Sequence, residues 1–283
     1  MEKLQKTISK YFAFFALPTV IAFALAFLVP FILGLYLSFT EFTTVTDSVF
    51  VGLKNYASAF SNADFKNALW FTVKFTVVTV VIINVVSFTF AYLLAKKIPG
   101  RNFFRTVFFM PNLIGGVVLG YIWQIIINGV LMGMGVDITY DAKYGFWGLV
   151  ILLSWQLIGY MMVIYIAGIQ NIPPELIEAA KIDGASSGQT LRHIVIPSVM
   201  PSVTICTFLT LTNAFKLFDQ NLALTAGAPM KQTQMLALDI YNTFYGRIGS
   251  EGVGQAKAVI FFVIVAVIAL IQLKATRSRE VEQ

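Results

Sequence analysis

The sequence predicts an all-α membrane protein with six transmembrane helices. Of its 283 residues, 58% are hydrophobic and only 12% are charged, whereas a soluble domain carries about 25% charged residues. A helix needs about 20 apolar residues to cross a hydrocarbon core of about 30 Å. Six stretches meet this requirement, at about residues 12–39, 68–95, 106–129, 146–170, 198–217 and 253–273.

The first stretch contains Pro18 and Pro30, which should kink it. It is too long for a signal-peptide core and no small-residue cleavage site follows, so we expect it to be retained. After it, the segment "GLKNYASAFSNADFKNALWF" from Gly52 has apolar residues at helical spacing, which predicts a short interfacial helix leading into the second stretch.

The net charge of +6 is unevenly distributed along the chain. Both termini and the loops after the second and fourth stretches together hold 12 basic and six acidic residues, and the rest of the chain holds eight of each. Cytoplasmic loops carry the excess of Lys and Arg. We therefore expect a membrane domain at 12–273 with cytoplasmic tails at 1–11 and 274–283, and no nucleic-acid partner.

Several functional classes lack support in the sequence. There is one cysteine, Cys206, one histidine, His193, and no phosphate-binding Gly-rich loop. We expect no enzymatic activity in this chain, no catalytic residue, no metal site and no cofactor. Asp and Glu are absent from the middle of all six stretches, which argues against a proton-driven secondary transporter. A secondary transporter or channel and a membrane anchor for an enzyme complex remain as alternatives.

One polar loop, "EAAKIDGASSGQTLRHIVIP" from Glu178 to Pro197, interrupts the apolar pattern. Pro174 suits a first helical turn, and Gly184 suits a left-handed C-terminal cap after Asp183. A second short helix is expected from about Ser186 to Ile194, ended by Pro197. Ile177 and Ile182 should form an apolar side, which suits docking to a partner. The alternative is an ordinary loop at about 174–197 that covers helix ends.

The residues "EAAKIDGA" followed by "HIVIPSVMP" resemble the EAA loop of ATP-binding-cassette (ABC) importer permeases. Their form is similar to that of the carbohydrate-uptake branch, the maltose-type and multiple-sugar permeases. "FDQNLALTAGAP", from Phe218 to Pro229, resembles an element that follows the fifth pass in sugar permeases. The resemblance covers nearly the whole chain and implies a type I ABC importer permease fold.

The resemblance also implies a mechanism and partners. The loop between the fourth and fifth helices would be a coupling helix that contacts a cytoplasmic ATPase, and the residues implied are Glu178, Ala179, Ala180, Asp183, Gly184, Ala185 and Pro197. The implied partners are a second homologous permease, two copies of an ABC ATPase and an extracellular sugar-binding protein. The implied substrate is a carbohydrate, expected to be an oligosaccharide, in a bacterial or archaeal plasma membrane. Another small neutral solute is the alternative.

Polar side chains within apolar stretches usually face a water-filled path or the interior of a helix bundle. The candidates for a substrate path are Asn84, Gln124, Asn128, Gln156, Asn213 and Lys216. Asp219 lies three residues after Lys216, within pairing distance on a helix. Trp155 and Tyr160 could stack on a sugar ring. Asn84 and Gln156 could equally form interhelical hydrogen bonds, and the aromatic residues could belong to packing or an interfacial belt.

Overall fold

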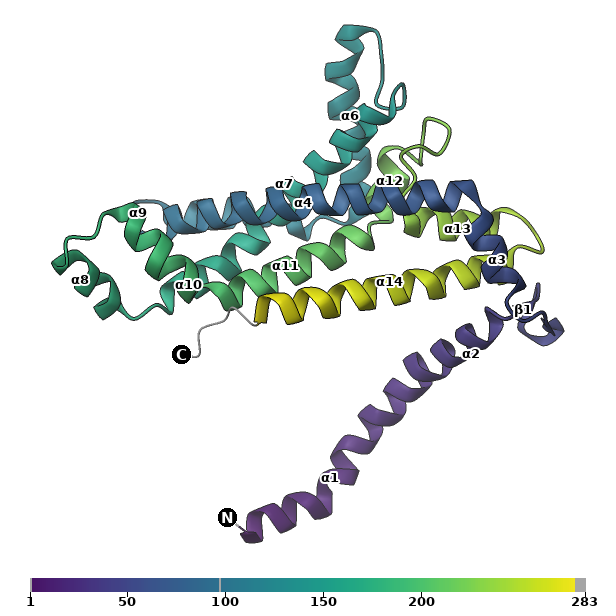
Figure 1. Cartoon of the computed structure of the whole chain (residues 1–283), viewed down its shortest axis with the longest axis horizontal. Helices are drawn as coiled ribbons and strands as arrows, with labels where there is room; N and C mark the ends of the chain where they lie inside the picture. The colour runs from purple at the N-terminus through teal and green to yellow at the C-terminus, as the bar shows by residue number, and fades with distance from the viewer. Residues whose placement is uncertain (1, 97, 278–283) are drawn as a thin grey trace. The chain divides into compact units, whose positions relative to one another are not determined.

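The computed structural model describes residues 2–96 and 98–277 and is almost entirely helical (Figure 1). The residues of the chain group by their mutual contacts into two compact units. The first comprises Met1–Asn62 with Ile240–Ile260, and the second comprises Ala63–Asp239 with Phe261–Gln283. We describe each unit by itself.

The first unit begins with one apolar helix whose hydrogen-bond register changes midway. It consists of α1 (Glu2–Phe23), a π-helical turn (Ala24–Leu28) and α2 (Val29–Leu37). The N–H of Val29 donates to the carbonyl of Ala24, five residues back. Because Pro30 has no N–H, the helix loses a hydrogen bond here, and the wider turn accommodates this loss.

A small hairpin follows, so the all-α prediction holds except at this point. Strands β1 (Thr40–Glu41) and β2 (Val49–Phe50) pair antiparallel, with a 3₁₀ turn at Val45–Asp47 between them. The Asp47 carboxylate accepts hydrogen bonds from Thr43 and Thr44, and these lower its pKa from 3.8 to about 2.

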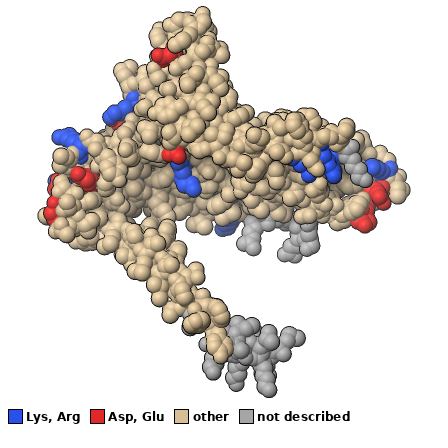
Figure 2. Space-filling view, turned by 180° about the vertical axis from the view of Figure 1, so that it is seen from behind, with Lys and Arg blue, Asp and Glu red and all other residues tan. Residues whose placement is uncertain are grey.

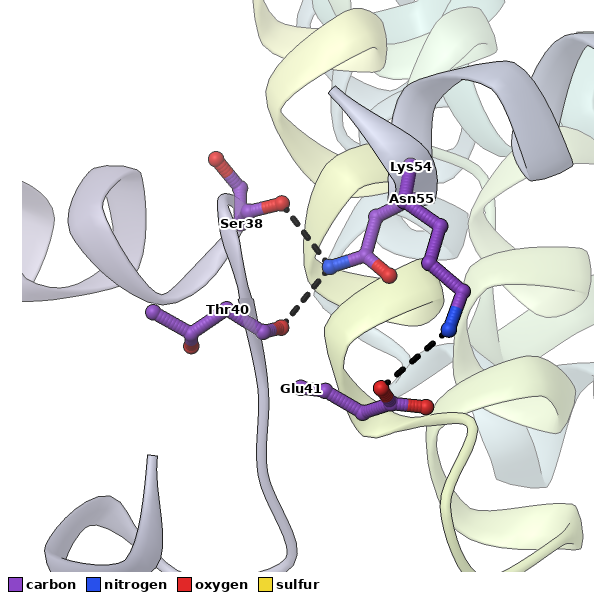
Figure 3. A network of polar contacts seen from close by, with 5 residues as sticks. All are labelled: Ser38, Thr40, Glu41, Lys54 and Asn55. Atoms are coloured by element: carbon purple, nitrogen blue, oxygen red, sulfur yellow. Dashed lines mark hydrogen bonds and ion pairs between the residues drawn. The ribbon is translucent and has the colours of Figure 1, made fainter. Parts of the chain in front are cut away.

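The predicted interfacial helix is present as α3 (Lys54–Ser61). Its Asn55 amide donates to the carbonyls of Ser38 (3.1 Å) and Thr40 (2.7 Å), and Lys54 Nζ lies 3.3 Å from Glu41 Oε2 (Figure 3). Asn55 is buried, so these two bonds satisfy its donors and fix α3 to the chain that leaves α2. The remainder of this unit is the end of α13 (Leu236–Gly246) and the start of α14 (Glu251–Arg277).

The second unit is built on three helices that pack together: α4 (Ala63–Ala95), α7 (Ala142–Gln170) and α11 (Met200–Phe215). Their facing sides bury Phe75, Ile83, Leu152 and Met161 completely. Ser87 Oγ on α4 donates to the carbonyl of Ile158 on α7 at 2.9 Å. Because α7 is buried along most of its length, it forms the centre of this unit.

The third apolar stretch, expected as one helix at 106–129, is divided in the structure. It forms α5 (Arg101–Phe109), a 3₁₀ turn (Met110–Leu113) and α6 (Gly116–Leu131), followed by a 3₁₀ turn at Met132–Met134. Pro111 lies inside the 3₁₀ turn, and Gly115 has extended backbone before α6. The prediction of one continuous helix at 106–129 was therefore wrong, because a proline followed by two glycines interrupts the backbone hydrogen bonds.

The number of predicted membrane passes agrees with the structure in the part of the chain that it describes. Five helices are long and apolar enough to cross a membrane, and a bent pair gives a sixth when it is counted as one span. The bent pair is Ser187–Ser198 with Met200–Phe215, inclined at 67° to each other. The five others are Phe14–Leu37, Ala63–Ala95, Gly116–Met134, Ala142–Gln170 and Glu251–Thr276.

Candidate functional site

The polar loop forms two short helices at one end of the bundle of α4, α7 and α11 (Figure 1). The first, α8 (Pro174–Ile182), ends as predicted on Gly184, whose φ is +77°. The N–H groups of Gly184 and Ala185 donate to the carbonyls of Lys181 (3.2 Å) and Ala180 (2.9 Å). This pair of bonds is a Schellman motif, which needs a left-handed residue at the position of Gly184.

The second short helix begins with a capping box between Ser186 and Gln189. It comprises α9 (Ser187–Thr190), a π-helical turn (Leu191–Val195) and α10 (Ile196–Ser198). The prediction that Pro197 ends this helix was wrong. The N–H of Ile196 donates to the carbonyl of Leu191, five residues back, so the wider turn accommodates Pro197 and the break falls at Val199.

The exposed surface of the loop differs from the predicted apolar side. Ile177 is half-buried and packs with Ile172 and Val195, whereas Ile182 is 86% exposed. Five residues on a helix turn through about 500°, so these two side chains cannot share a face. The exposed apolar side instead carries Leu176, Ala179 and Ile182, at three-residue spacing.

The predicted coupling residues divide by exposure. Glu178, Ala179, Asp183 and Gly184 are exposed, Ala185 and Pro197 are half-buried, and Ala180 is buried. A groove of about 310 Å³ lies between the turn at 183–185 and the second short helix and is lined by Asp183, Gly184, Ala185, Gln189, Thr190, His193 and Ile194. The His193 ring lies 3.1 Å from the carbonyl of Gln189. The loop therefore offers both a groove and an apolar ridge at its surface.

A second polar feature lies where two helices are interrupted. The 3₁₀ turn between α5 and α6 contributes Asn112, the connection between α11 and α12 (Asp219–Leu224) contributes Lys216, and α12 contributes Gln220 to one pocket of about 160 Å³. Gln156 and Asn213 also line this pocket. Interrupted membrane helices expose backbone groups, and they are tolerated where they line a cavity.

Gln156 connects the two breaks through its side-chain amide. Its Nε2 donates to the carbonyl of Ile114 at 3.3 Å, and its Oε1 accepts from Gln220 Nε2 at 2.9 Å. The structure thus brings three predicted path residues, Gln156, Asn213 and Lys216, to one place. Sequence reasoning missed Asn112 and Gln220. The signal for Asn112 was its place in "MPNLIGG", where proline and glycines interrupt an apolar run.

Other predicted path residues lie away from this pocket. Asn84 accepts from Tyr165 Oη at 2.7 Å, which links α4 to α7. Gln124 donates to the carbonyl of Leu224 at 3.0 Å, and Asn128 accepts from the N–H of Ile138 at 2.9 Å. These bonds match the interhelical alternative stated for Asn84.

The aromatic candidates lie outside this pocket, and the expected ion pair between Lys216 and Asp219 does not form. Trp155 packs edge-on against Trp123, and Tyr160 against Phe109. Lys216 and Asp219, both described, form no ion pair. The pairing was wrong because α11 ends at Phe215 and α12 starts at Asp219, so the two residues do not share a helix.

The motif at Phe218–Pro229 forms a tightly bonded turn. Asn221 is fully buried, its amide donates to Thr225 Oγ1 (3.1 Å) and the carbonyl of Thr233 (2.8 Å), and its Oδ1 accepts from the N–H of Met235 (2.9 Å). These bonds hold both ends of the segment that connects α12 to α13. The tip of this segment carries Met230 and Lys231, both exposed and both with positive φ.

The uncharged surface of the chain and its similarity to known proteins both indicate a component of membrane transport. Most of the visible surface in Figure 2 is uncharged, as contact with lipid requires. Residues 88–276 match the family described as binding-protein-dependent transport system inner membrane component. The chain belongs to this family.

Its relatives include several sugar permeases. It is 50% identical to a probable starch degradation products transport system permease protein, AmyD, of Thermoanaerobacterium thermosulfurigenes, over 96% of this chain and 95% of the relative. It is 30% identical to the multiple sugar-binding transport system permease protein MsmF of Streptococcus mutans, over 98% and 99%. This inner membrane component is therefore a permease of the carbohydrate-uptake branch, as its motifs predicted.

Solved structures support the fold of this inner membrane component. A chain of a bacterial ABC transporter involved in the import of the acidic polysaccharide alginate aligns with a TM-score of 0.81. The alignment covers 98% of this chain and 99% of the other, at 19% identity. The six-pass architecture with its polar loop is thus that of an ABC importer permease.

Proposed function

We propose that this permease moves an oligosaccharide from an extracellular binding protein into the cytoplasm by alternating access. The observation that carries the proposal is the pocket where two interrupted helices meet around Gln156. Its polar side chains, apart from Lys216, are amides, which both donate to and accept from hydroxyl groups. Amides without carboxylates suit a neutral, hydroxyl-rich solute, and the relatives named for starch products and multiple sugars point to the same class.

The driving force comes from a separate ATPase. Two copies of this ATPase and a second homologous permease complete the complex. The polar loop docks on the ATPase with Leu176, Ala179 and Ile182 as the apolar ridge, and Glu178 and Asp183 beside it. The groove under Gly184 and Ala185 receives part of the same partner. The loop is cytoplasmic, as are both termini.

Coupling follows from the rigidity of the loop. The Schellman motif at Gly184 and the capping box at Ser186 fix α8 and α9 at both ends of their connection. When the ATPase dimer closes, this rigid pair moves as one body, and α10 transmits the motion to α11 through the bend at Val199. Lys216 and Asn213, at the far end of α11, then move relative to Gln156 on α7. The pocket opens to one side at a time.

One relative suggests a second candidate substrate class. An sn-glycerol-3-phosphate transport system permease protein, UgpA, of Agrobacterium fabrum is 30% identical over 82% of this chain. Lys216 gives the pocket one positive charge, which could pair with the phosphate of a phosphorylated polyol.

The test is ATP-driven uptake by the purified complex in proteoliposomes, with labelled maltooligosaccharides, arabinooligosaccharides, alginate fragments and glycerol 3-phosphate. We expect uptake of a neutral oligosaccharide, dependent on ATP and on the binding protein. Uptake of glycerol 3-phosphate alone would favour the second candidate. Uptake of any of them by this polypeptide without an ATPase would reject the ATP-driven mechanism.

A further inference from the structure

A cavity of about 530 Å³ lies in the second unit, away from the polar pocket around Gln156. It is lined by the first turns of α4, the start of α7 and the segment at 230–232. This volume is within the range of small-molecule sites. Three lysines line it, Lys74, Lys143 and Lys231, together with one carboxylate, Asp64.

The charges of this cavity leave an excess of two ammonium groups. Asp64 Oδ2 lies 2.7 Å from Lys231 Nζ, so these two groups neutralise each other. In the described part of the chain, Lys74 and Lys143 have no carboxylate within ion-pair distance. Lys74 Nζ instead lies 5.6 Å from the centre of the Trp70 ring. A site with two uncompensated ammonium groups favours an anionic ligand.

The exposed face of α4 places this cavity at the level of lipid headgroups. Trp70, Lys74, Val77, Val81 and Val85 recur at helical spacing and are all exposed. After Lys74, towards the C-terminus of α4, this face is apolar. Before Lys74, towards the start of α4, Asn67 and Lys66 make it polar. A change from valine to Trp and Lys along one helix face is typical of a membrane–water interface.

The length of α4 is consistent with Lys74 lying at the level of the lipid headgroups. Its 33 residues span about 50 Å, about 20 Å more than a hydrocarbon core. If the last 20 residues of α4, from Thr76 to Ala95, cross the hydrocarbon core, Lys74 lies two residues outside it. On α7, Trp147, Ile151 and Trp155 form an exposed face that continues from Lys143. Both unpaired lysines thus lie at the polar end of a face suited to lipid.

The wall formed by residues 230–232 is held in place by the buried network around Asn221. Met230 and Lys231 have φ values of +44° and +64°, a conformation that costs non-glycine residues energy. The Asp64 carboxylate raises the pKa of Lys231, which therefore stays charged. The cavity is consequently a preformed site.

We infer that this cavity binds the phosphate headgroup of an anionic phospholipid, with Lys74 and Lys143 as the ammonium groups that contact it. Trp70 lies beside the headgroup at the top of the acyl chains. The lipid belongs to the leaflet on the side where α4 begins. This inference is independent of the transported solute, because it depends only on the rim of the membrane domain.

The test uses the purified transporter complex in nanodiscs of phosphatidylcholine. Brominated phosphatidylglycerol or brominated phosphatidylcholine is added at equal mole fraction, and quenching of Trp70 is obtained as the difference from a Trp70→Phe variant. We expect stronger quenching by the anionic lipid. Each of Lys74→Gln and Lys143→Gln should lower this preference about fivefold, the effect of one basic residue near an anionic surface.

Lys66→Gln is the matched control, since Lys66 is an exposed lysine of α4 that does not line the cavity. Quenching by brominated phosphatidylcholine should be equal in all variants, which shows that they are folded. An absence of preference in the unmodified protein, or an equal loss in Lys66→Gln, would overturn the inference. Loss of the preference on adding inorganic phosphate at constant ionic strength would assign the site to a soluble anion and overturn the lipid assignment.

Discussion

The backbone conformation of Gly184 sets the turn between α8 and α9, and the proposed coupling depends on this turn. The φ of +77° at Gly184 closes the Schellman motif, and beyond its two chain neighbours no residue has an atom within 4 Å of a Cβ built on it. A side chain there would therefore have space but the wrong backbone conformation. The sequence "DG" predicted this turn, because Gly is the residue that adopts left-handed φ without steric cost.

Gly184→Val should uncouple the loop from the ATPase. A β-branched residue in the left-handed region costs about 1–2 kcal/mol, so the angle between α8 and α9 should change. We expect ATPase co-purification and sugar-stimulated hydrolysis to fall together, at unchanged membrane expression. Gly188→Val is the control, because Gly188 also has open space but an ordinary φ. Full coupling in Gly184→Val would show that this turn does not transmit force.

Gln220→Ala should weaken sugar transport. It removes the donor to Gln156 Oε1 and one amide from the pocket. Loss of one hydrogen bond of about 0.5–1.5 kcal/mol predicts a roughly twofold to tenfold rise in the sugar concentration for half-maximal uptake. Asn84→Ala is the contrasting variant, since Asn84 bonds to Tyr165 outside the pocket. It should lower thermal stability and leave half-saturation unchanged, and the opposite pattern would exchange the two roles.

At the scale of elements, the sequence predicted where apolar helices run better than where they break. The ends of α4, α7 and α14 follow the apolar stretches and were predicted within about five residues. The end of α11 at Phe215 was predicted within two residues, but the interruption at Met110–Leu113 was not predicted. The apolar composition continues across this break, and only tertiary contacts, such as Gln156 bonding to the carbonyl of Ile114, compensate for the lost backbone bonds. The pocket was missed for the same reason.

Gly159→Ala tests the close packing of α5 against α7. A Cβ at Gly159 would overlap the carbonyl of Phe108, which is backbone and cannot rotate away. Separation of the two helices should cost about 1–3 kcal/mol, as overpacking does, and would move Asn112 away from Gln156. Gly129→Ala on α6 is the control, with nothing near its Cβ. Thermal unfolding of the purified complex checks this, and equal melting temperatures for the two variants would contradict the packing.

For the whole molecule, apolar stretches of membrane-spanning length predicted the number of passes, and two motifs predicted the family. They could not predict the substrate path, because side chains from the 3₁₀ turn after α5 and from α7, α11 and α12 meet there only in three dimensions. The charge asymmetry predicts orientation. Ser186→Cys should be protected from an impermeant thiol reagent outside intact cells, and Met230→Cys, 85% exposed in the unsubstituted chain, should be labelled. The reverse pattern would invert the topology.

Alternating access at the polar pocket is the central claim, and accessibility of Asn213→Cys tests it most directly. Asn213 lines the pocket and is exposed, and its amide donates to the carbonyl of Leu209 on its own helix, while the native Cys206 is buried and should react little. In the assembled complex, external labelling of Asn213→Cys should rise when the ATPase is trapped with nucleotide, and Gly184→Val should abolish this rise. Labelling that does not change with nucleotide would contradict an ATP-driven switch at this pocket.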